Sequence, residues 1–108
     1  MKVLIDVAAS HELVEGRAKV VEVNGKFIAV ARVEGSVFAI DNACPHRNGE
    51  LGRGDLLGHH LYCPLHAWCF DVRSGRAFFP AGARVARFEV SEAEGRIFVS
   101  DEPMPATS

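Results

Sequence analysis

The chain has 108 residues, of which 48% are hydrophobic, which is enough for one domain with a modest core. Twelve Lys and Arg against fourteen Asp and Glu leave a formal charge of −2, without a long run of either sign. This balance argues against nucleic acid as a partner, because binding nucleic acid requires a basic face. No apolar run approaches the roughly 18 residues that span a membrane, and Met1–Ser10 is too short for a signal peptide. We therefore expect a cytoplasmic protein with no membrane contact.

The first forty residues predict a meander of β-strands. Apolar and β-branched residues are concentrated over 3–7, 17–23, 26–33 and 36–40. Asn24-Gly25 is a strong hairpin signal, because a type I′ turn needs positive φ at both central positions. Glu34-Gly35 is expected to turn the chain again, and 10–16 to form a loop with one helical turn at most.

The pattern changes after Asp41. Residues 42–61 are rich in Gly and follow no hydrophobic period, and so long an irregular stretch in a compact domain usually carries function. Strands are expected again over 70–72, 84–90 and 96–100, with turns at 73–75 and at Glu94-Gly95. Residues 101–108 are expected to form a frayed tail. The sequence therefore predicts an all-β domain with an irregular insertion.

Two short segments each carry one cysteine and one histidine. Cys44-Pro45-His46 is followed, sixteen residues later, by Cys63-Pro64-Leu65-His66. Thiolates and imidazoles bind zinc and the iron of iron–sulfur clusters. The two segments therefore predict one metal centre held by Cys44, His46, Cys63 and His66, against the alternative that the pairs are coincidental neighbours.

The order of these ligands favours iron over zinc. Structural zinc sites usually pair like ligands at C-x2–4-C and H-x3–5-H, whereas each segment here is mixed. In Rieske [2Fe–2S] centres, two His replace two Cys on one of the two irons. The pattern C-P-H-x16-C-P-L-H closely resembles the Rieske signature, and residues 67–75 resemble the segment that follows the second His in soluble Rieske ferredoxins. A zinc-bound interaction module stays open as an alternative.

The resemblance to soluble Rieske ferredoxins extends over the whole chain in length and strand order. It implies a single Rieske domain over 1–108, an antiparallel β-sandwich with a smaller cluster-binding subdomain formed by the two ligand loops, at about 42–80. It also implies one [2Fe–2S] cluster per chain, with Cys44 and Cys63 on the buried iron and His46 and His66 on the outer iron. Residues 79–81 fall where the family places a third loop over the cluster.

Two departures from the respiratory members of this family bear on the redox potential. Those members carry an extra Cys in each loop, which form a disulfide, and hydroxyl side chains that bond to the cluster sulfurs. In this chain Gly49 and Leu65 occupy the positions of the two extra Cys, and Trp68 and Phe70 occupy the positions of the hydroxyl side chains. Because fewer donors stabilise the reduced state less, we expect a potential nearer about −150 mV than +300 mV. Ala67 replaces the usual Gly directly after the second His.

The resemblance implies an electron carrier and not an enzyme. Such a protein takes one electron from a flavin-dependent ferredoxin reductase and passes it to a terminal oxygenase, as the ferredoxin of a dioxygenase system does. A catalytic mononuclear iron domain does not fit in 108 residues, and we expect a monomer. The alternative is the small subunit of an assimilatory nitrite reductase, whose partner would be the reductase large subunit.

The remaining reactive or charged residues have ordinary interpretations. Cys69 is expected to be a buried, inert thiol, and Trp68 to pack under the cluster loop. His59 and His60 are expected to be solvated, and His11 to have no role. The charged side chains near the first loop are expected to be solvated, with steering of a redox partner as the functional alternative: Arg47, Glu50 and Arg53.

Overall fold

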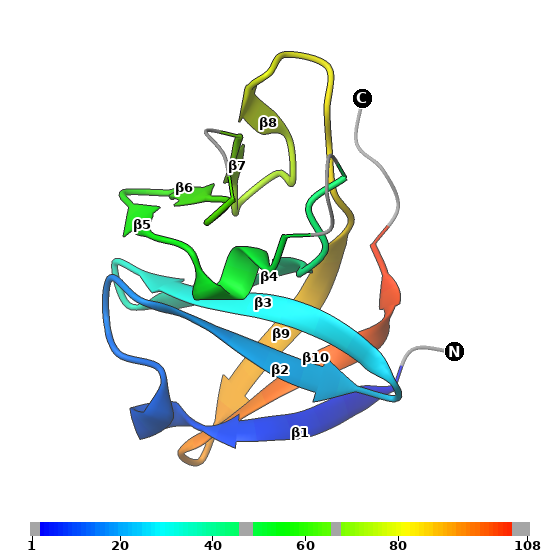
Figure 1. The fold of residues 1–108 in the computed structure, drawn as a ribbon. Helices are drawn as coiled ribbons and strands as arrows, with labels where there is room; N and C mark the ends of the chain where they lie inside the picture. The colour runs from blue at the N-terminus through cyan, green and yellow to red at the C-terminus, as the bar shows by residue number, and fades with distance from the viewer. Residues whose placement is uncertain (1–2, 46–48, 66–67, 105–108) are drawn as a thin grey trace.

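The structure, a computed structural model, describes residues 3–45, 49–65 and 68–104. Strands joined by tight turns make up most of the chain, together with two short 3-10 helices (Figure 1). The elements are β1 Leu4–Ala9, η1 Ser10–Glu12, β2 Ala18–Val23, β3 Lys26–Val33, β4 Ser36–Asp41, η2 Leu51–Arg53, β5 Leu56–Leu57, β6 His60–Tyr62, β7 Cys69–Asp71, β8 Ala77–Phe79, β9 Arg87–Ala93 and β10 Arg96–Pro103. No helix in the described ranges has the length and apolar character needed to cross a membrane. The predicted all-β class is confirmed.

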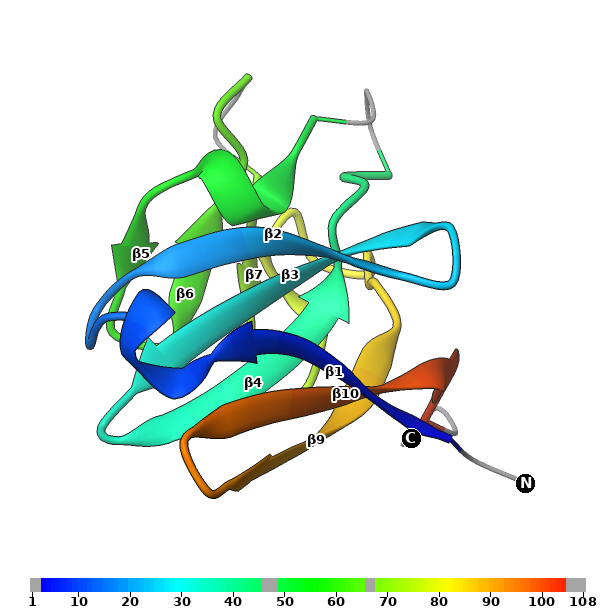
Figure 2. The same cartoon turned by 90° about the horizontal axis from the view of Figure 1, so that it is seen from below.

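The strands form two antiparallel sheets. The large sheet has the order β1-β10-β9-β4-β3-β2, and it curls so that its two edge strands, β1 and β2, come into contact. The small sheet has the order β5-β6-β7-β8 and lies against one side of the large sheet, as Figures 1 and 2 show. This is the predicted sandwich with a smaller subdomain.

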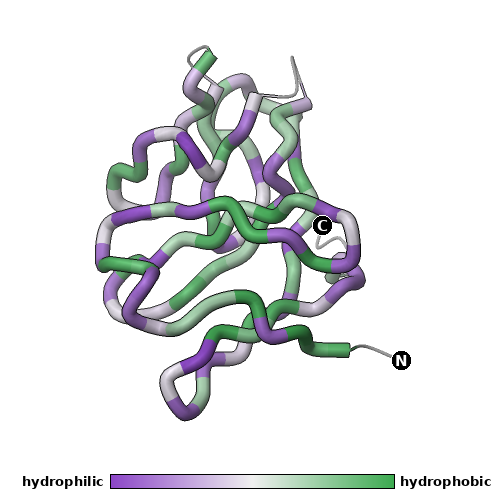
Figure 3. Tube along the Cα trace, turned by 60° about the horizontal axis from the view of Figure 1, so that its bottom comes forward, coloured by the Kyte–Doolittle hydropathy of each residue, from purple (hydrophilic) through white to green (hydrophobic). Residues whose placement is uncertain are grey.

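Three hairpins of the large sheet turn through the same backbone conformation. Both central residues have positive φ in each turn: 50° and 85° at Asn24-Gly25, 52° and 81° at Glu34-Gly35, and 52° and 77° at Glu94-Gly95. Positive φ at both positions matches the right-handed twist of the flanking strands. The three turns were predicted from the sequence and are confirmed. Figure 3 shows hydrophilic residues gathered at the turns and hydrophobic residues along the strands.

The described residues form two hydrophobic cores that share strand β3. Ile28 and Val30 point into the curled large sheet, whereas Ala29 and Ala31 point toward the small sheet. The scaffold core inside the large sheet contains Leu13, Val21, Val23, Ile28, Val30, Ala39, Phe88, Ile97 and Val99. The second core, between the sheets, contains Ala29, Ala31, Val33, Ile40, Cys44, Leu51, Leu61, Cys63, Phe70 and Val72. Because β3 is buried on both faces, it fixes the small sheet on the large one.

Two sequence-based boundaries were wrong. The stretch predicted to be irregular contains strands β5 and β6, which are too short to show a period. The predicted frayed tail is a strand as far as Pro103, because β10 continues between its neighbours: Asp101 N–H donates to Val3 O at 3.3 Å, and Met104 N–H donates to Arg87 O at 2.7 Å. Residues 105–108 lie outside the described ranges.

Candidate metal centre

The two cysteine segments form loops that are closed by the same backbone hydrogen bond. Cys44 N–H donates to Gly49 O at 2.9 Å, and Cys63 N–H donates to Trp68 O at 2.9 Å. In each loop the donor is the cysteine and the acceptor lies five residues later in the chain. The two loops therefore present their cysteines in equivalent positions, at the point where each loop begins.

The two loops meet at Gly49. A Cβ added to this buried glycine would lie 2.6 Å from Cys63 Sγ and 3.2 Å from Leu65 Cδ1. The sulfur of the second loop therefore rests directly on the backbone of the first, in space that any other residue at position 49 would fill. Gly49 and Leu65, the two positions at which a disulfide was excluded from the sequence, face each other, and Cys44, Cys63 and Cys69 form no disulfide.

The first loop is anchored by the residues that precede it. Asp41 Oδ1 accepts Ala43 N–H at 3.0 Å, and the buried Asn42 accepts Gly52 N–H through its Oδ1 at 2.8 Å. Asn42 also accepts Leu51 N–H at its backbone carbonyl at 2.8 Å. Asn42 thereby ties the end of β4 to η2 across the loop. Sequence reasoning missed it, although Asp-Asn at a strand end is a typical signal for side chains that bond to a turn.

The second loop joins β6 to β7 as the end of a hairpin. Tyr62 and Cys69 are paired across the two strands, directly before and after the loop residues. Gly54, which follows η2, lies so close to the carbonyl oxygen of Tyr62 that a Cβ there would overlap with it. Tyr62 N–H donates to Asp55 O at 2.9 Å, so the segment that follows η2 is bonded to β6 directly before the second cysteine loop.

The structure brings together two of the four predicted ligands. Cys44 and Cys63 are both buried and belong to the same core, next to Leu51, Leu61 and Phe70. The other two, His46 and His66, lie outside the described residues. Within residues 3–45, 49–65 and 68–104, no three His, Cys, Asp or Glu side chains converge on one point. Two soft thiol ligands in an apolar surrounding fit an iron–sulfur cluster, which requires thiolates and exclusion of water.

Trp68 and Phe70, which occupy the positions of hydroxyl side chains in respiratory Rieske proteins, pack in or against the core that contains the thiols. Phe70 is fully buried in the second core, and Trp68 is half-buried, with its ring centroid 6.5 Å from that of Phe70. Both side chains pack under the loop as apolar groups. The predicted packing role of Trp68 is confirmed.

Further side chains near the two loops are Cys69, the neighbouring His59 and His60, and the charged Glu50 and Arg53. Cys69 is buried, with 2% of its surface exposed, as predicted. His59 and His60, predicted to be solvated and not to ligate metal, are both half-buried: His59 meets the ring of Phe38 edge-on, and His60 packs against Phe78 with centroids 4.8 Å apart. Exposed Arg53 and Glu50 form an ion pair of 3.0 Å, and Arg47 lies outside the described residues.

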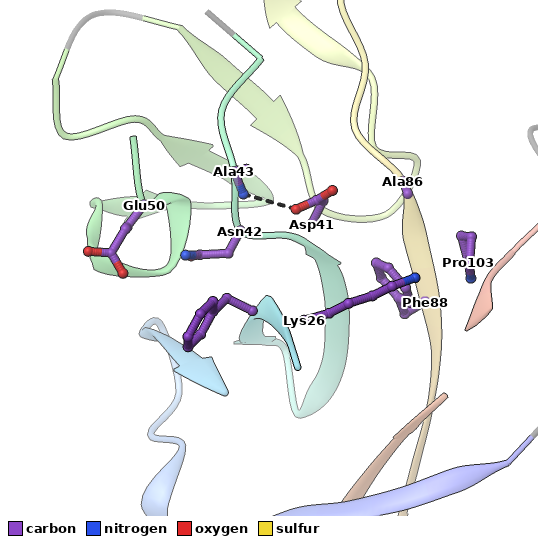
Figure 4. A pocket seen from close by; sticks show the side chains of 9 residues that line it. Lys26, Asp41, Asn42, Ala43, Glu50, Ala86, Phe88 and Pro103 are labelled. Carbon is purple, nitrogen blue, oxygen red and sulfur yellow. Dashed lines mark hydrogen bonds between the residues drawn. The ribbon is translucent and has the colours of Figure 1, made fainter. Parts of the chain in front are cut away.

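A pocket of about 580 Å³ lies beside the first loop (Figure 4). Its walls are largely apolar, with charged side chains at the edge, and it is lined by Lys26, Phe27, Asp41, Asn42, Ala43, Glu50, Ala86, Phe88 and Pro103. Neither cysteine lines it. The pocket therefore belongs to the flank of the loop, on the side facing β3 and β9, and not to the thiol site.

The family comparison agrees with this geometry. The family model described as "Rieske [2Fe-2S] domain" matches residues 3–89. A curated relative from Ralstonia sp, the ferredoxin component of naphthalene 1,2-dioxygenase/salicylate 5-hydroxylase systems, is 44% identical over 73 residues, which are 68% of this chain and 70% of the relative.

Solved structures share the whole fold. A chain of the complex of reduced oxygenase and oxidized ferredoxin in carbazole 1,9a-dioxygenase superimposes with a TM-score of 0.88 at 28% identity, covering 95% of this chain and 97% of that chain. A putative NADH-dependent nitrite reductase small subunit from Mycobacterium tuberculosis gives a TM-score of 0.86 at 24% identity, covering 94% and 97%. At that identity, the second match is evidence for the fold alone.

Proposed function

This chain belongs to the Rieske [2Fe-2S] domain family, and on that premise we propose that it carries single electrons from a flavin-dependent reductase to a terminal oxygenase. The electron-carrier role itself follows from the curated relatives at 40% identity or more, which are named as ferredoxin components of dioxygenase systems. The main support is the pair of equivalent loops: Gly49 accepts the N–H of buried Cys44 at its backbone carbonyl and lies against the sulfur of buried Cys63. We further infer that the protein acts as a monomer.

We propose that Cys44 and Cys63 bind the inner iron of one Rieske [2Fe–2S] cluster and that His46 and His66 bind the outer iron. The support for the cysteines is their burial and the shared loop geometry; for the histidines it is the ligand order in the sequence. When bound, the cluster takes up and releases one electron. The chain's part is to hold the thiols in place, to exclude water and to present one edge of the site to partners.

The described side chains account for the holding and the shielding. Asn42 fixes the entrance of the first loop through Gly52 N–H, and Gly49 leaves room for the sulfur of Cys63. The buried side chains of Leu51, Leu61 and Phe70 keep water from the thiols on the inner side. An apolar inner side, with Trp68 and Phe70 at the two positions where respiratory members carry hydroxyls, favours the less charged, oxidised state, which supports our expectation of a low potential.

One set of measurements on the purified holoprotein tests this function. We expect a red-brown protein, a Rieske-type EPR signal after reduction, two irons and two sulfides per chain, and a potential near the low end of the range, about −150 mV. Reduction by NADH should require only a flavin-dependent ferredoxin reductase. A colourless, zinc-containing protein would overturn the proposal, and a strongly positive potential would overturn its account of the cluster surroundings.

The relatives favour an oxygenase partner over a nitrite reductase. The curated relatives at 40% identity or more are ferredoxin components of dioxygenase systems, whereas the nitrite reductase subunits match at 24% or 16% and share the fold only. Co-purification of the chain with a large sirohaem-containing subunit would instead support the nitrite reductase alternative.

A further inference from the structure

Phe27 on strand β3 is an exposed aromatic residue beside the first cysteine loop. It is 57% exposed, and its backbone carbonyl accepts Asn42 N–H at 3.3 Å, which joins the residue after β4 to the start of β3. Phe27 and Asn42 both line the pocket of about 580 Å³ next to that loop. A cavity of this size can hold a large side chain of a partner. An exposed aromatic ring therefore borders a cavity that the scaffold has already formed.

Two exposed carboxylates flank Phe27. Glu22 is paired with Phe27 across β2 and β3, so the two side chains lie on the same face of the sheet, a few ångströms apart. Val20, two residues before Glu22, points toward η2, because a Cβ added to Gly52 would lie 2.7 Å from its Cγ2. Glu22 therefore faces the side of the sheet on which η2 lies. Glu50 directly precedes η2 and lines the pocket together with Phe27.

The lysine that lines the pocket lies at the other end of the cavity. Lys26 extends toward Phe88 and away from Glu50 (Figure 4), with its ammonium group 6.0 Å from the centroid of the Phe88 ring. Arg53 forms an ion pair with Glu50 in which both side chains are exposed, and exposed pairs are weak. The two carboxylates beside Phe27 outnumber this one cation. The end of the pocket next to Phe27 is therefore complementary to a positive charge.

Asn42 presents a buried hydrogen-bond donor to the pocket. It is only 4% exposed, and its Oδ1 accepts Gly52 N–H at 2.8 Å. Its Nδ2 donates to no atom of residues 3–45, 49–65 and 68–104, and it points toward the side of the pocket where Glu50 lies (Figure 4). A buried amide donor without an acceptor costs free energy, so it favours a ligand that supplies one. The carbonyl oxygen of a peptide is such an acceptor.

The pocket adjoins the neck of the first cysteine loop. Ala43 and Glu50 form an isolated antiparallel bridge, and directly inside this bridge Cys44 N–H donates to Gly49 O at 2.9 Å. Ala43 and Glu50 both line the pocket. A protein segment that is seated there therefore contacts the residue before Cys44 and the residue after Gly49. It lies beside the predicted centre and leaves the tips of both loops uncovered.

We propose that the surface formed by Glu22, Phe27, Asn42 and Glu50, which we term the Phe27 surface, docks a segment of the electron-transfer partner that carries a large apolar side chain next to a Lys or Arg. The apolar side chain packs on Phe27, and the cation pairs with the two carboxylates. A backbone carbonyl of the segment accepts from Asn42 Nδ2. The inference rests on the proposed electron-carrier function for the identity of the partner. Charge steering raises the association rate, while the aromatic contact provides most of the affinity.

The test uses the holoprotein and a fluorescently labelled pentapeptide, Gly-Lys-Phe-Lys-Gly. We expect binding at low salt that weakens as salt is added. Phe27→Ala should lower the affinity at least about fivefold, because the peptide loses its aromatic contact, and a peptide with Ser in place of Phe should lose as much. Glu22→Gln/Glu50→Gln should lower the affinity about tenfold at low salt and reduce its salt dependence, because the charge contacts are lost.

Each variant has a matched control on another part of the molecule. Phe79→Ala removes an equally exposed ring, 56% against 57% for Phe27, from the edge strand β8 of the small sheet. Glu34→Gln/Glu94→Gln removes two exposed carboxylates from hairpin turns at the opposite end of the large sheet. Both controls should bind the peptide within about twofold of wild type, because neither changes the Phe27 surface.

The outcomes separate this inference from the proposed function. Equal affinity of wild type and Phe27→Ala, or tighter binding of Gly-Glu-Phe-Glu-Gly than of the lysine peptide, would overturn the docking inference. So would concentration-dependent self-association that Phe27→Ala abolishes, because the occupant would then be a second copy of the chain. If these results came from red-brown protein with an intact Rieske EPR signal, the electron-carrier function would stand. If wild type lacked the signal, the proposed function would fail whatever the peptide did.

Discussion

The large sheet and the small sheet are stabilised by different means. The large sheet has long strands, three tight hairpins and a core of its own inside the curl. The strands of the small sheet have two or three residues. Their hydrophobic core includes residues of β3 and β4 and the two buried thiols. Strands this short do not form a stable sheet by themselves. The large sheet is therefore a self-sufficient scaffold, and the small sheet depends on the scaffold and on what the cysteines bind.

The largest expected effect is the loss of the centre in Cys63→Ala. Because metal binding contributes to folding where the ligands are buried, removal of this thiol should abolish the Rieske EPR signal and loosen the small sheet. Hydrogen exchange measured by NMR should then show lost protection in β6 and β7, with protection retained in β3, β9 and β10. Equal loss in both sheets would show that the scaffold is not self-sufficient.

A matched pair of core substitutions makes the comparison quantitative. Ile97 in the scaffold core and Leu61 in the second core are both fully buried. Ile97→Ala should lower the free energy of unfolding by about 2–5 kcal/mol, with or without the cluster. Leu61→Ala should lower cluster retention and change the urea midpoint of cluster-free protein much less, because the second core is already loosened in that state. Similar midpoints for the two cluster-free variants would contradict the distinction.

The difference between the sheets also explains what could be predicted from the sequence. The scaffold was predictable because strands of six to eight residues show an alternation, and Asn24-Gly25 marks a turn by local chemistry. The small sheet was largely missed because a strand such as Leu56–Leu57 is too short for any period. Its existence depends on tertiary contacts, which a local pattern does not contain.

The candidate site shows the same division between local and tertiary signals. Its cysteines were identified from their spacing to histidine. The absence of a disulfide was predicted because Gly49 and Leu65 occupy the two positions where it would form. The structural role of Gly49 was not predictable, because it depends on Cys63 approaching from another loop. The same holds for the packing of His59 on Phe38, where residues far apart in the chain meet.

A third, smaller effect on the free energy of unfolding is expected from the hydrogen bonds and the ion pair of Arg32 in the scaffold. Half-buried Arg32 donates to Leu13 O at 2.8 Å, Ser10 O at 3.2 Å and Gly35 O at 3.1 Å, and pairs with Glu92 at 2.7 Å. Arg32→Met should therefore cost roughly 1–3 kcal/mol of unfolding free energy at neutral pH, because it leaves several carbonyls without their donor. Urea denaturation measures this loss, and a loss of cluster in the variant would contradict its assignment to the scaffold.

The same ion pair predicts a pH dependence with a definite sign. The hydrogen bond from Arg32 lowers the pKa of Glu92 below its ordinary value of 4.5. A lowered folded-state pKa gives stability that is fully present above the unfolded value and is lost as pH falls through the folded value. As pH falls from 4.5 through the lowered folded-state pKa of Glu92, the carboxylate becomes protonated, and the difference in unfolding free energy between wild type and Arg32→Met should shrink. A difference that grows in acid would contradict this sign.

The smallest effect on the centre is expected from Cys69, the third buried thiol. Cys69 lies on β7 between Tyr62 and Phe79, outside both loops, and its burial is explained by packing. Cys69→Ala removes one small group from a packed site and should cost about 1 kcal/mol of stability, while the EPR signal and the potential stay unchanged. Cys69→Ser should cost somewhat more, because it buries a hydroxyl. Loss of the EPR signal from an otherwise folded Cys69→Ala protein would make Cys69 a ligand. The pairing of Cys44 with Cys63, and with it the dependence of the small sheet on those two thiols, would then be wrong.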